Sequence, residues 1–246
     1  MAQTVRPGVN LKLCLLVHIT VFAWYVFILY SNCSLDISGR HPGARTYGGR
    51  WKYLTFINLV MQTGFFAVCV ITDVAHLVVP SRSTRGTVLF LVSARDGLFT
   101  VLAAPVGTFV CASFWSLYAY DRELVYPKLI DHIIPVWLNH ALHTAVMPLL
   151  LLQMYLQHHR HPSRPKAILS LALFASLYLA WVLWVRHISG IWVYPIMARL
   201  SPLGLVLFLA IASVSMVPIY LLGEKLSHAV WSTAVIPDQS TTHLQV

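Results

Sequence analysis

Several side chains that could do chemistry lie in apolar stretches of the chain, where polar groups are uncommon. When 51–79 is drawn as a helix at ~100° per residue, one narrow stripe collects Thr55, Asn58, Gln62, Cys69, Asp73 and His76. The apolar stretch 133–157 likewise gathers His140, His143 and Thr144 on one face. Polar groups inside a membrane are costly, so a function is expected on these faces. The alternative is that they only form hydrogen bonds between helices.

A threonine paired with a histidine would suit ester cleavage. The threonine hydroxyl is a weak nucleophile that needs a general base, and histidine titrates near neutrality. In an apolar cavity the pair could attack the carbonyl of a long-chain lipid ester, with Asn58, Asn139 or a tyrosine orienting the imidazole or stabilising the oxyanion. The sequence has no Gly-x-Ser-x-Gly motif, which argues against the usual serine hydrolase. Spacing alone does not choose between His140 and His143.

Two other functions could use the same residues. His140, His143 and His187 could bind one metal ion, although the carboxylates that a di-iron site needs are absent nearby. The histidines of 158–161 lie roughly 22 Å further along the same helix and are expected in a solvated turn that faces headgroups. The polar stripe of 51–79 could instead line a transport path, but the sequence shows no inverted repeats or paired broken helices.

The elements that position these residues must lie in a membrane. Apolar residues make up 58% of the 246 residues and charged residues only 10%, whereas a soluble domain is about a quarter charged. Crossing a bilayer takes about 20 apolar residues, and the stretches that approach this are 13–30, 51–79, 97–118, 133–157, 167–185 and 202–222. The sequence therefore predicts an all-α polytopic membrane protein, one bundle of six transmembrane helices. The stretch 87–94 is expected in the interface, and 237–246 as a disordered tail.

Six spans put both termini on one face of the membrane, which we name side A; side B is the opposite face. The net charge is +9, but the bases are scattered and form no basic helix, so anionic headgroups are expected as partners and nucleic acid is not. Basic residues number nine on side A and eight on side B, so the positive-inside rule does not orient the chain. Asn32 begins a glycosylation sequon that abuts the first helix too closely for modification.

Several runs in matching order resemble one known family, the androgen-induced and androgen-dependent membrane proteins that hydrolyse fatty acid esters of hydroxy fatty acids. The runs are YGGRWKYLTF (47–56), YAYDRE (118–123), YPK (126–128), IPVWLNHALHT (134–144), WVYP (192–195) and YLLGE (220–224). The resemblance covers nearly the whole chain, from the first helix to about Trp231. The subgroup named for regulating tissue factor pathway inhibitor looks slightly closer, and the stretch 34–45 departs from both subgroups.

The resemblance implies six helices, cytosolic termini, and a threonine nucleophile paired with a histidine, with neither metal nor organic cofactor. The family threonine falls on Thr55 and the family histidine on His143. An acyl-threonine intermediate and a long-chain lipid ester substrate follow from it. One of two arginines, Arg122 or Arg186, is expected to meet the substrate carboxylate. The other residues that we expect to flank the pair or contact the substrate are Asn58, Asn139, His140 and His187.

Overall fold

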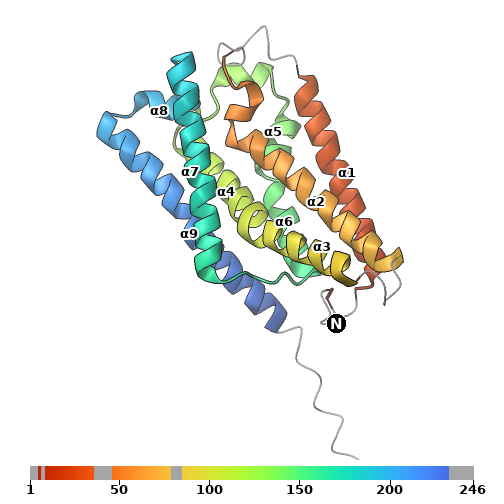
Figure 1. The fold of residues 1–246 in the computed structure, drawn as a ribbon. Helices are drawn as coiled ribbons and strands as arrows, with labels where there is room; N and C mark the ends of the chain where they lie inside the picture. Colours follow the sequence, from red (N-terminus) through yellow and green to blue (C-terminus); the bar gives the residue numbers. More distant parts are fainter. Residues whose placement is uncertain (1–4, 7–8, 36–45, 79–84, 233–246) are drawn as a thin grey trace, which may run out of the picture.

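The computed structural model describes residues 5–6, 9–35, 46–78 and 85–232, and every regular element within these ranges is a helix. The long helices run side by side as one bundle (Figure 1). Helices α1 (Leu11–Ser34) and α2 (Leu54–Val78) form one flank, and α7 (Arg164–Ser189) and α9 (Pro202–Ser232) form the other. The tail predicted at 237–246 lies outside the described residues.

The described residues contain five helices long and apolar enough to cross a membrane: α1, α2, a 39-residue helix over Gly86–Leu124, α7 and α9. Much of their outer surface is apolar; on α7, for example, Leu169, Leu173 and Leu177 are each at least 60% exposed. Water would not tolerate such a contiguous surface, but lipid would. The prediction of an all-α membrane protein is confirmed.

The predicted span 133–157 is divided into two short helices, α5 (Val136–His143) and α6 (Val146–Leu156), so no sixth long helix is present among the described residues. Pro148 explains the break, because it has no N–H and its ring clashes with the carbonyl of Thr144 one turn earlier. The N–H groups of Thr144 and Ala145 both donate to His140 O. The carbonyl of His143 instead accepts a hydrogen bond from Trp115 Nε1 at 3.3 Å.

No helix boundary separates the stretch 87–94 from the predicted span 97–118. Helix α3 (Arg85–Gly97) continues through the π-helical turn η2 (Leu98–Ala103) into α4 (Ala104–Asp121). The stretch 87–94, expected in the interface, is therefore the first part of this helix. The adjacent charges Arg95 and Asp96 do not end the helix, because Arg95 Nη2 lies 2.8 Å from Asp96 Oδ1 and both side chains are buried.

The expectation of a solvated turn at 158–161 is wrong for His159, which is 1% exposed. Its Nδ1 donates to Asp96 Oδ1 at 3.0 Å, and Gln153 Nε2 lies 3.1 Å from its Nε2. Burial lowers the pKa of His159 to about 4. The turn after α6 is thus attached to the long helix through Asp96.

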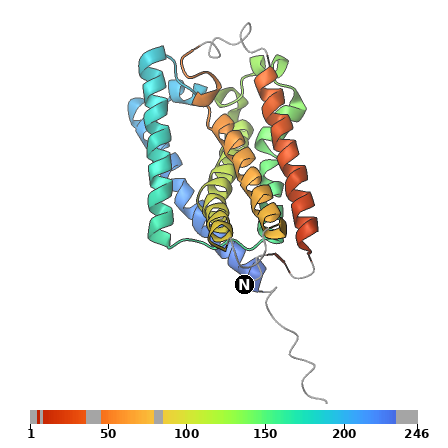
Figure 2. The ribbon, with the colours of Figure 1, turned by 45° about the vertical axis from the view of Figure 1, so that its right-hand side comes forward.

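Short helices gather at the end of the bundle opposite the start of α1 and the end of α9 (Figures 1 and 2). They are η1 (Gly49–Lys52), η3 (Arg122–Leu124), η4 (Lys128–His132) and α8 (Pro195–Arg199). This end carries the connections assigned to side B. The first described helix begins, and the last ends, at the other end of the bundle, side A.

The core has two main parts that meet at the start of α2. One buried apolar cluster joins α1, α2, α5 and α6 and includes Phe56. Another joins η2, α4, α7 and α9 and includes Leu54. The helices approach closely at Gly107 on α4, where a Cβ would come within 2.8 Å of Gln62 Nε2 and Leu150 Cδ1. Thr55, between Leu54 and Phe56, therefore lies at the junction of the two parts.

Candidate functional site

Thr55 and His143 face each other across the side-B half of the bundle. Thr55 is in the first turn of α2, His143 is the last residue of α5, and Thr55 Oγ1 lies 3.2 Å from His143 Nε2. The two residues are 88 positions apart in sequence. The separation is within hydrogen-bond range for a hydroxyl and an imidazole nitrogen.

The imidazole of His143 is held from two directions. Its Nδ1 lies 2.9 Å from Asn139 Oδ1 and 3.0 Å from Asn139 O, one turn earlier on α5. Because both partners are acceptors, Nδ1 carries the proton and the lone pair of Nε2 faces the Thr55 hydroxyl. The ring of Phe114 stacks on the imidazole with centroids 3.6 Å apart. Orientation and tautomer both suit a base that accepts the threonine proton.

The first turn of α2 places the positive end of a helix dipole beside the Thr55 hydroxyl. Leu54 N–H donates to Tyr194 Oη at 3.0 Å, and the N–H groups of Phe56 and Ile57 donate to Tyr53 O. The positive end of a helix dipole can stabilise a negative charge that develops beside it.

A cavity of about 690 Å³ reaches Thr55 and His143 from side B. Its wall comes from the end of α1, η1, the segment 125–134, and the segment 191–198, and it is mostly apolar. Two cationic side chains, Arg50 and Lys52, also line it. Its size and lining suit a long-chain lipid with one charged end.

Electrostatics at this cavity follow from burial. Lys52 is only 2% exposed, and burial lowers the pKa of its ammonium from the ordinary value. On the opposite wall, burial raises the pKa of Tyr126 to about 12, so its hydroxyl stays protonated and donates to Ile134 O. The Lys52 ammonium donates to Thr46 Oγ1, and both residues line the cavity.

Of the predicted flanking residues, Asn139 is hydrogen-bonded to His143, whereas Asn58 and His140 have their hydrogen-bond partners elsewhere. Asn58 accepts a hydrogen bond from Gln62 Nε2 deeper in the bundle, and His140 turns its Nδ1 to Thr144 Oγ1 at 2.9 Å and stacks on Trp115. His187 is exposed near Trp184. None of these three lines the cavity.

The arginines expected to meet a carboxylate are also absent from the cavity wall. Arg122 Nη2 is 2.6 Å from Asp131 Oδ1, and the Arg186 guanidinium lies over the Trp192 ring. Arg50 and Lys52 occupy the wall instead. The sequence contains a signal for them, since both precede Thr55 within the run 47–56, but they were counted only among the eight basic residues of side B.

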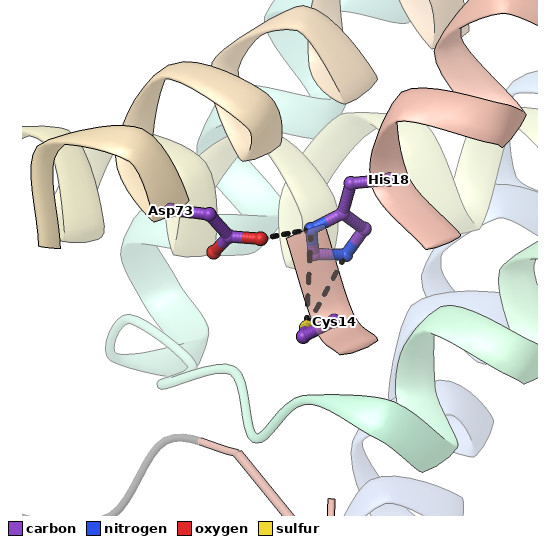
Figure 3. A group of neighbouring side chains, drawn as sticks. All are labelled: Cys14, His18 and Asp73. Atoms are coloured by element: carbon purple, nitrogen blue, oxygen red, sulfur yellow. Dashed lines mark hydrogen bonds and ion pairs between the residues drawn. The ribbon is translucent and has the colours of Figure 1, made fainter. Parts of the chain in front are cut away.

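The metal alternative finds no support in the positions of His140, His143 and His187, which form no close donor group. Among the described residues one group of three donors lies together, Cys14, His18 and Asp73, at the side-A end (Figure 3). There His18 Nδ1 is 2.6 Å from Asp73 Oδ2, shorter than the roughly 3.3 Å between two ligands of one tetrahedral zinc ion.

The other nitrogen of His18 is also occupied. Its Nε2 lies 2.8 Å from Gln153 Oε1, and the side chains of His18, Asp73 and Gln153 are all buried. The cluster therefore reads as hydrogen bonding that ties α1, α2 and α6 together, which is the structural interpretation considered for Asp73.

Comparison with known proteins gives the same family along nearly the whole chain. The FAR-17a/AIG1-like protein family matches residues 13–228. The human androgen-induced gene 1 protein is 41% identical over 228 residues, 89% of this chain and 92% of that protein. The human androgen-dependent TFPI-regulating protein is 42% identical over 216 residues, 87% of this chain and 91% of that protein.

A more distant relative is a Schizosaccharomyces pombe protein described as a UPF0641 membrane protein, 26% identical over 69% of this chain and 71% of its own length. No solved structure matches the chain. The match of the family over residues 13–228, together with the two human relatives, shows that this chain belongs to the FAR-17a/AIG1-like family of membrane proteins.

Proposed function

We propose that this protein is an intramembrane lipid esterase that hydrolyses fatty acid esters of hydroxy fatty acids, with Thr55 as nucleophile and His143 as general base. The observation that carries the proposal is the 3.2 Å contact of Thr55 Oγ1 with His143 Nε2 at the wall of a 690 Å³ apolar cavity. The resemblance of the sequence to a family of such hydrolases supports the same reaction.

In the first step Nε2 of His143 takes the Thr55 hydroxyl proton while Oγ1 attacks the ester carbonyl carbon. The positive end of the α2 helix dipole, at the turn that carries Thr55, stabilises the negative charge on the carbonyl oxygen. When the tetrahedral intermediate collapses, the bond from the carbonyl carbon to the alkoxide oxygen breaks. His143 returns its proton to that oxygen, and the hydroxy fatty acid leaves an acyl-threonine behind.

The second step repeats the chemistry with water. His143 takes a proton from a water molecule, and the resulting hydroxide attacks the acyl carbonyl. The bond to Thr55 Oγ1 breaks, Oγ1 regains the proton from His143, and the fatty acid is released. Asn139 keeps the proton of Nδ1 in place through both steps, so that Nε2 can alternate between base and acid.

The test is covalent labelling by a fluorophosphonate probe together with hydrolysis of a hydroxy fatty acid ester, in detergent or in vesicles. Thr55→Val keeps the branched shape of the side chain but removes the hydroxyl, and we expect it to lose both labelling and hydrolysis. His143→Ala should lose hydrolysis by ~10³-fold or more, because the hydroxyl then has no base.

Matched controls lie on the same helices. Thr63 on α2 donates to Leu59 O, so Thr63→Val should label as the wild type does. His140 on α5 is hydrogen-bonded to Thr144 outside the cavity, so His140→Ala should retain hydrolysis. Full labelling of Thr55→Val, or hydrolysis unchanged in His143→Ala, would overturn the proposal.

A further inference from the structure

A second, smaller cavity lies on the far side of Thr55. Its volume is about 120 Å³, and residues of α2, α4, α7, α8 and α9 line it. Four residues line both cavities: Thr55, Phe114, Val125 and Tyr194. The Thr55 side chain therefore stands at the junction of a wide space and a narrow one.

The two cavities differ in chemistry. Two serines line the narrow one, but Ser113 donates to Phe109 O at 2.6 Å and Ser213 donates to Leu209 O at 2.8 Å. Tyr178 donates to Lys52 O, and its hydroxyl also contacts that of Tyr194. The polar side chains on the described wall are thus already hydrogen-bonded, and the remaining surface is apolar. Such a space accepts hydrocarbon and nothing that needs a hydrogen bond.

The wide cavity carries groups that suit a carboxylate. The guanidinium of Arg50 uses Nη2 to donate to Leu35 O at 2.7 Å, but its Nε is buried without a partner. The ammonium of Lys52 lines the same cavity. A buried donor left unpaired is costly, and a carboxylate oxygen would satisfy it.

We infer that the narrow cavity binds the unsubstituted acyl chain of the ester, the part transferred to Thr55, while the wide cavity binds the hydroxy acid with its free carboxylate toward Arg50 and Lys52. This inference rests on the proposed function. The ester carbonyl lies at Thr55, where the cavities meet, so a substrate with chains on both sides of the ester fills both. When the alkoxide leaves, the hydroxy acid departs through the wide cavity and water enters by the same route, while the acyl chain stays in the narrow one.

The residue that tests the assignment is Ala212 on α9, which lines the narrow cavity. Ala212→Phe would fill that space. Ala210 lies on the same helix but is exposed and lines neither cavity, so Ala210→Phe is the matched control. Two ester series are needed: one varies the acyl chain with a fixed hydroxy acid, and the other varies the hydroxy acid with a fixed short acyl chain.

We expect Ala212→Phe to lower kcat/KM for long acyl chains by at least about tenfold while short acyl esters stay within about twofold of wild type. The relative kcat/KM values across the hydroxy-acid series should be unchanged in Ala212→Phe. The Ala210→Phe variant should match the wild type in both ester series. Arg50→Gln should reduce the preference for the free acid over its methyl ester without changing the acyl-length profile.

Several outcomes would overturn the assignment. A shift in the hydroxy-acid series instead of the acyl series means that the substrate binds the other way round, and equal loss in both series means that the narrow cavity selects no chain. In either case Thr55→Val tells the two proposals apart. If Thr55→Val abolishes hydrolysis, the esterase proposal stands and only the cavity assignment fails; if Thr55→Val hydrolyses normally, the esterase proposal fails.

Discussion

At the scale of single residues, Asn139 is the feature that turns a Thr–His contact into an oriented pair. A histidine used as a base must present the unprotonated nitrogen to the nucleophile, and the group bound to the other nitrogen decides this. Here both the side-chain oxygen and the carbonyl of Asn139 accept from Nδ1 of His143. The α-helical geometry supplies the carbonyl, and the residue type supplies the amide.

Replacing Asn139 by Leu should lower kcat about 10- to 100-fold with little change in KM. The loss is smaller than the ~10⁴-fold caused by altering the third member of a serine protease triad, because the main-chain carbonyl still accepts from Nδ1. Steady-state kinetics on a hydroxy fatty acid ester measure the changes in kcat and in KM separately. Asn139→Asp keeps an oxygen acceptor and should recover most of kcat; if it is as inactive as Asn139→Leu, the asparagine is only structural.

At the scale of elements, the long α3–α4 helix is attached to the turn after α6 by a polar network. Asp96 accepts hydrogen bonds from His159 Nδ1 at 3.0 Å and from the N–H of Arg160 at 3.3 Å, besides its contact with Arg95. Gln153 joins the same histidine to His18 on α1. Three helices and one turn therefore depend on a histidine that has no exposure to water.

His159 predicts a loss of stability in mild acid. Its pKa falls from the ordinary 6.5 in the unfolded chain to about 4 in the fold, because burial disfavours the imidazolium. The unfolded state then binds more protons between these values, so the stability is complete above pH ~6.5 and is lost as the pH falls toward 4, by roughly 3 kcal/mol at most. Thermal unfolding of the detergent-solubilised protein across this range measures the effect.

The control for this prediction is His159→Gln, which keeps hydrogen-bonding groups but does not titrate. We expect a lower melting temperature at pH 7 and a shallower decline between pH 6.5 and 4 than in the wild type. If the melting temperatures of the two proteins decline in parallel as the pH falls, carboxylates and not His159 cause the acid sensitivity.

The elements also show which parts of the fold hydropathy could predict. Long apolar stretches predict α1, α2, α7 and α9, because lipid imposes length and apolarity on each segment separately. Hydropathy failed where a polar residue finds partners in another element, as Asp96 does with His159 and Arg160. The division at Thr144 follows from Pro148, but a proline alone does not predict it, since Pro218 lies inside the continuous helix α9.

At the scale of the whole molecule, the site is assembled from residues far apart in the chain. The spacing of Thr55 and His143 could not pair them, because only the packing of α5 against α2 decides which histidine faces the threonine. The resemblance chose His143, and in the structure it is this histidine that contacts Thr55. Arg50, Lys52 and the narrow cavity were not predicted, because they depend on the side-B connections and on α9 leaning across α4.

The orientation of the molecule in the membrane remains a proposal, and a native cysteine can test it. Cys33 is exposed at the side-B end of α1, whereas Cys14 and Cys69 are buried and Cys111 is half-buried. If side A is cytosolic, a membrane-impermeant maleimide added to intact cells or to sealed vesicles of known orientation should label Cys33 from the non-cytosolic side. Cys33→Ser should abolish that labelling, since the buried thiols are out of reach.

A residue at side A provides the complementary labelling experiment. Ser163 precedes α7 at side A, so Ser163→Cys in the Cys33→Ser background should be labelled only after the membrane is permeabilised. This pattern would put the opening of the wide cavity on the non-cytosolic face, and the esters would then reach Thr55 from that leaflet. The opposite pattern is that Cys33 is labelled only after permeabilisation, whereas the Ser163→Cys variant is labelled before it. That result would reverse the orientation and move substrate entry to the cytosolic leaflet, but it would leave the Thr55–His143 chemistry unchanged.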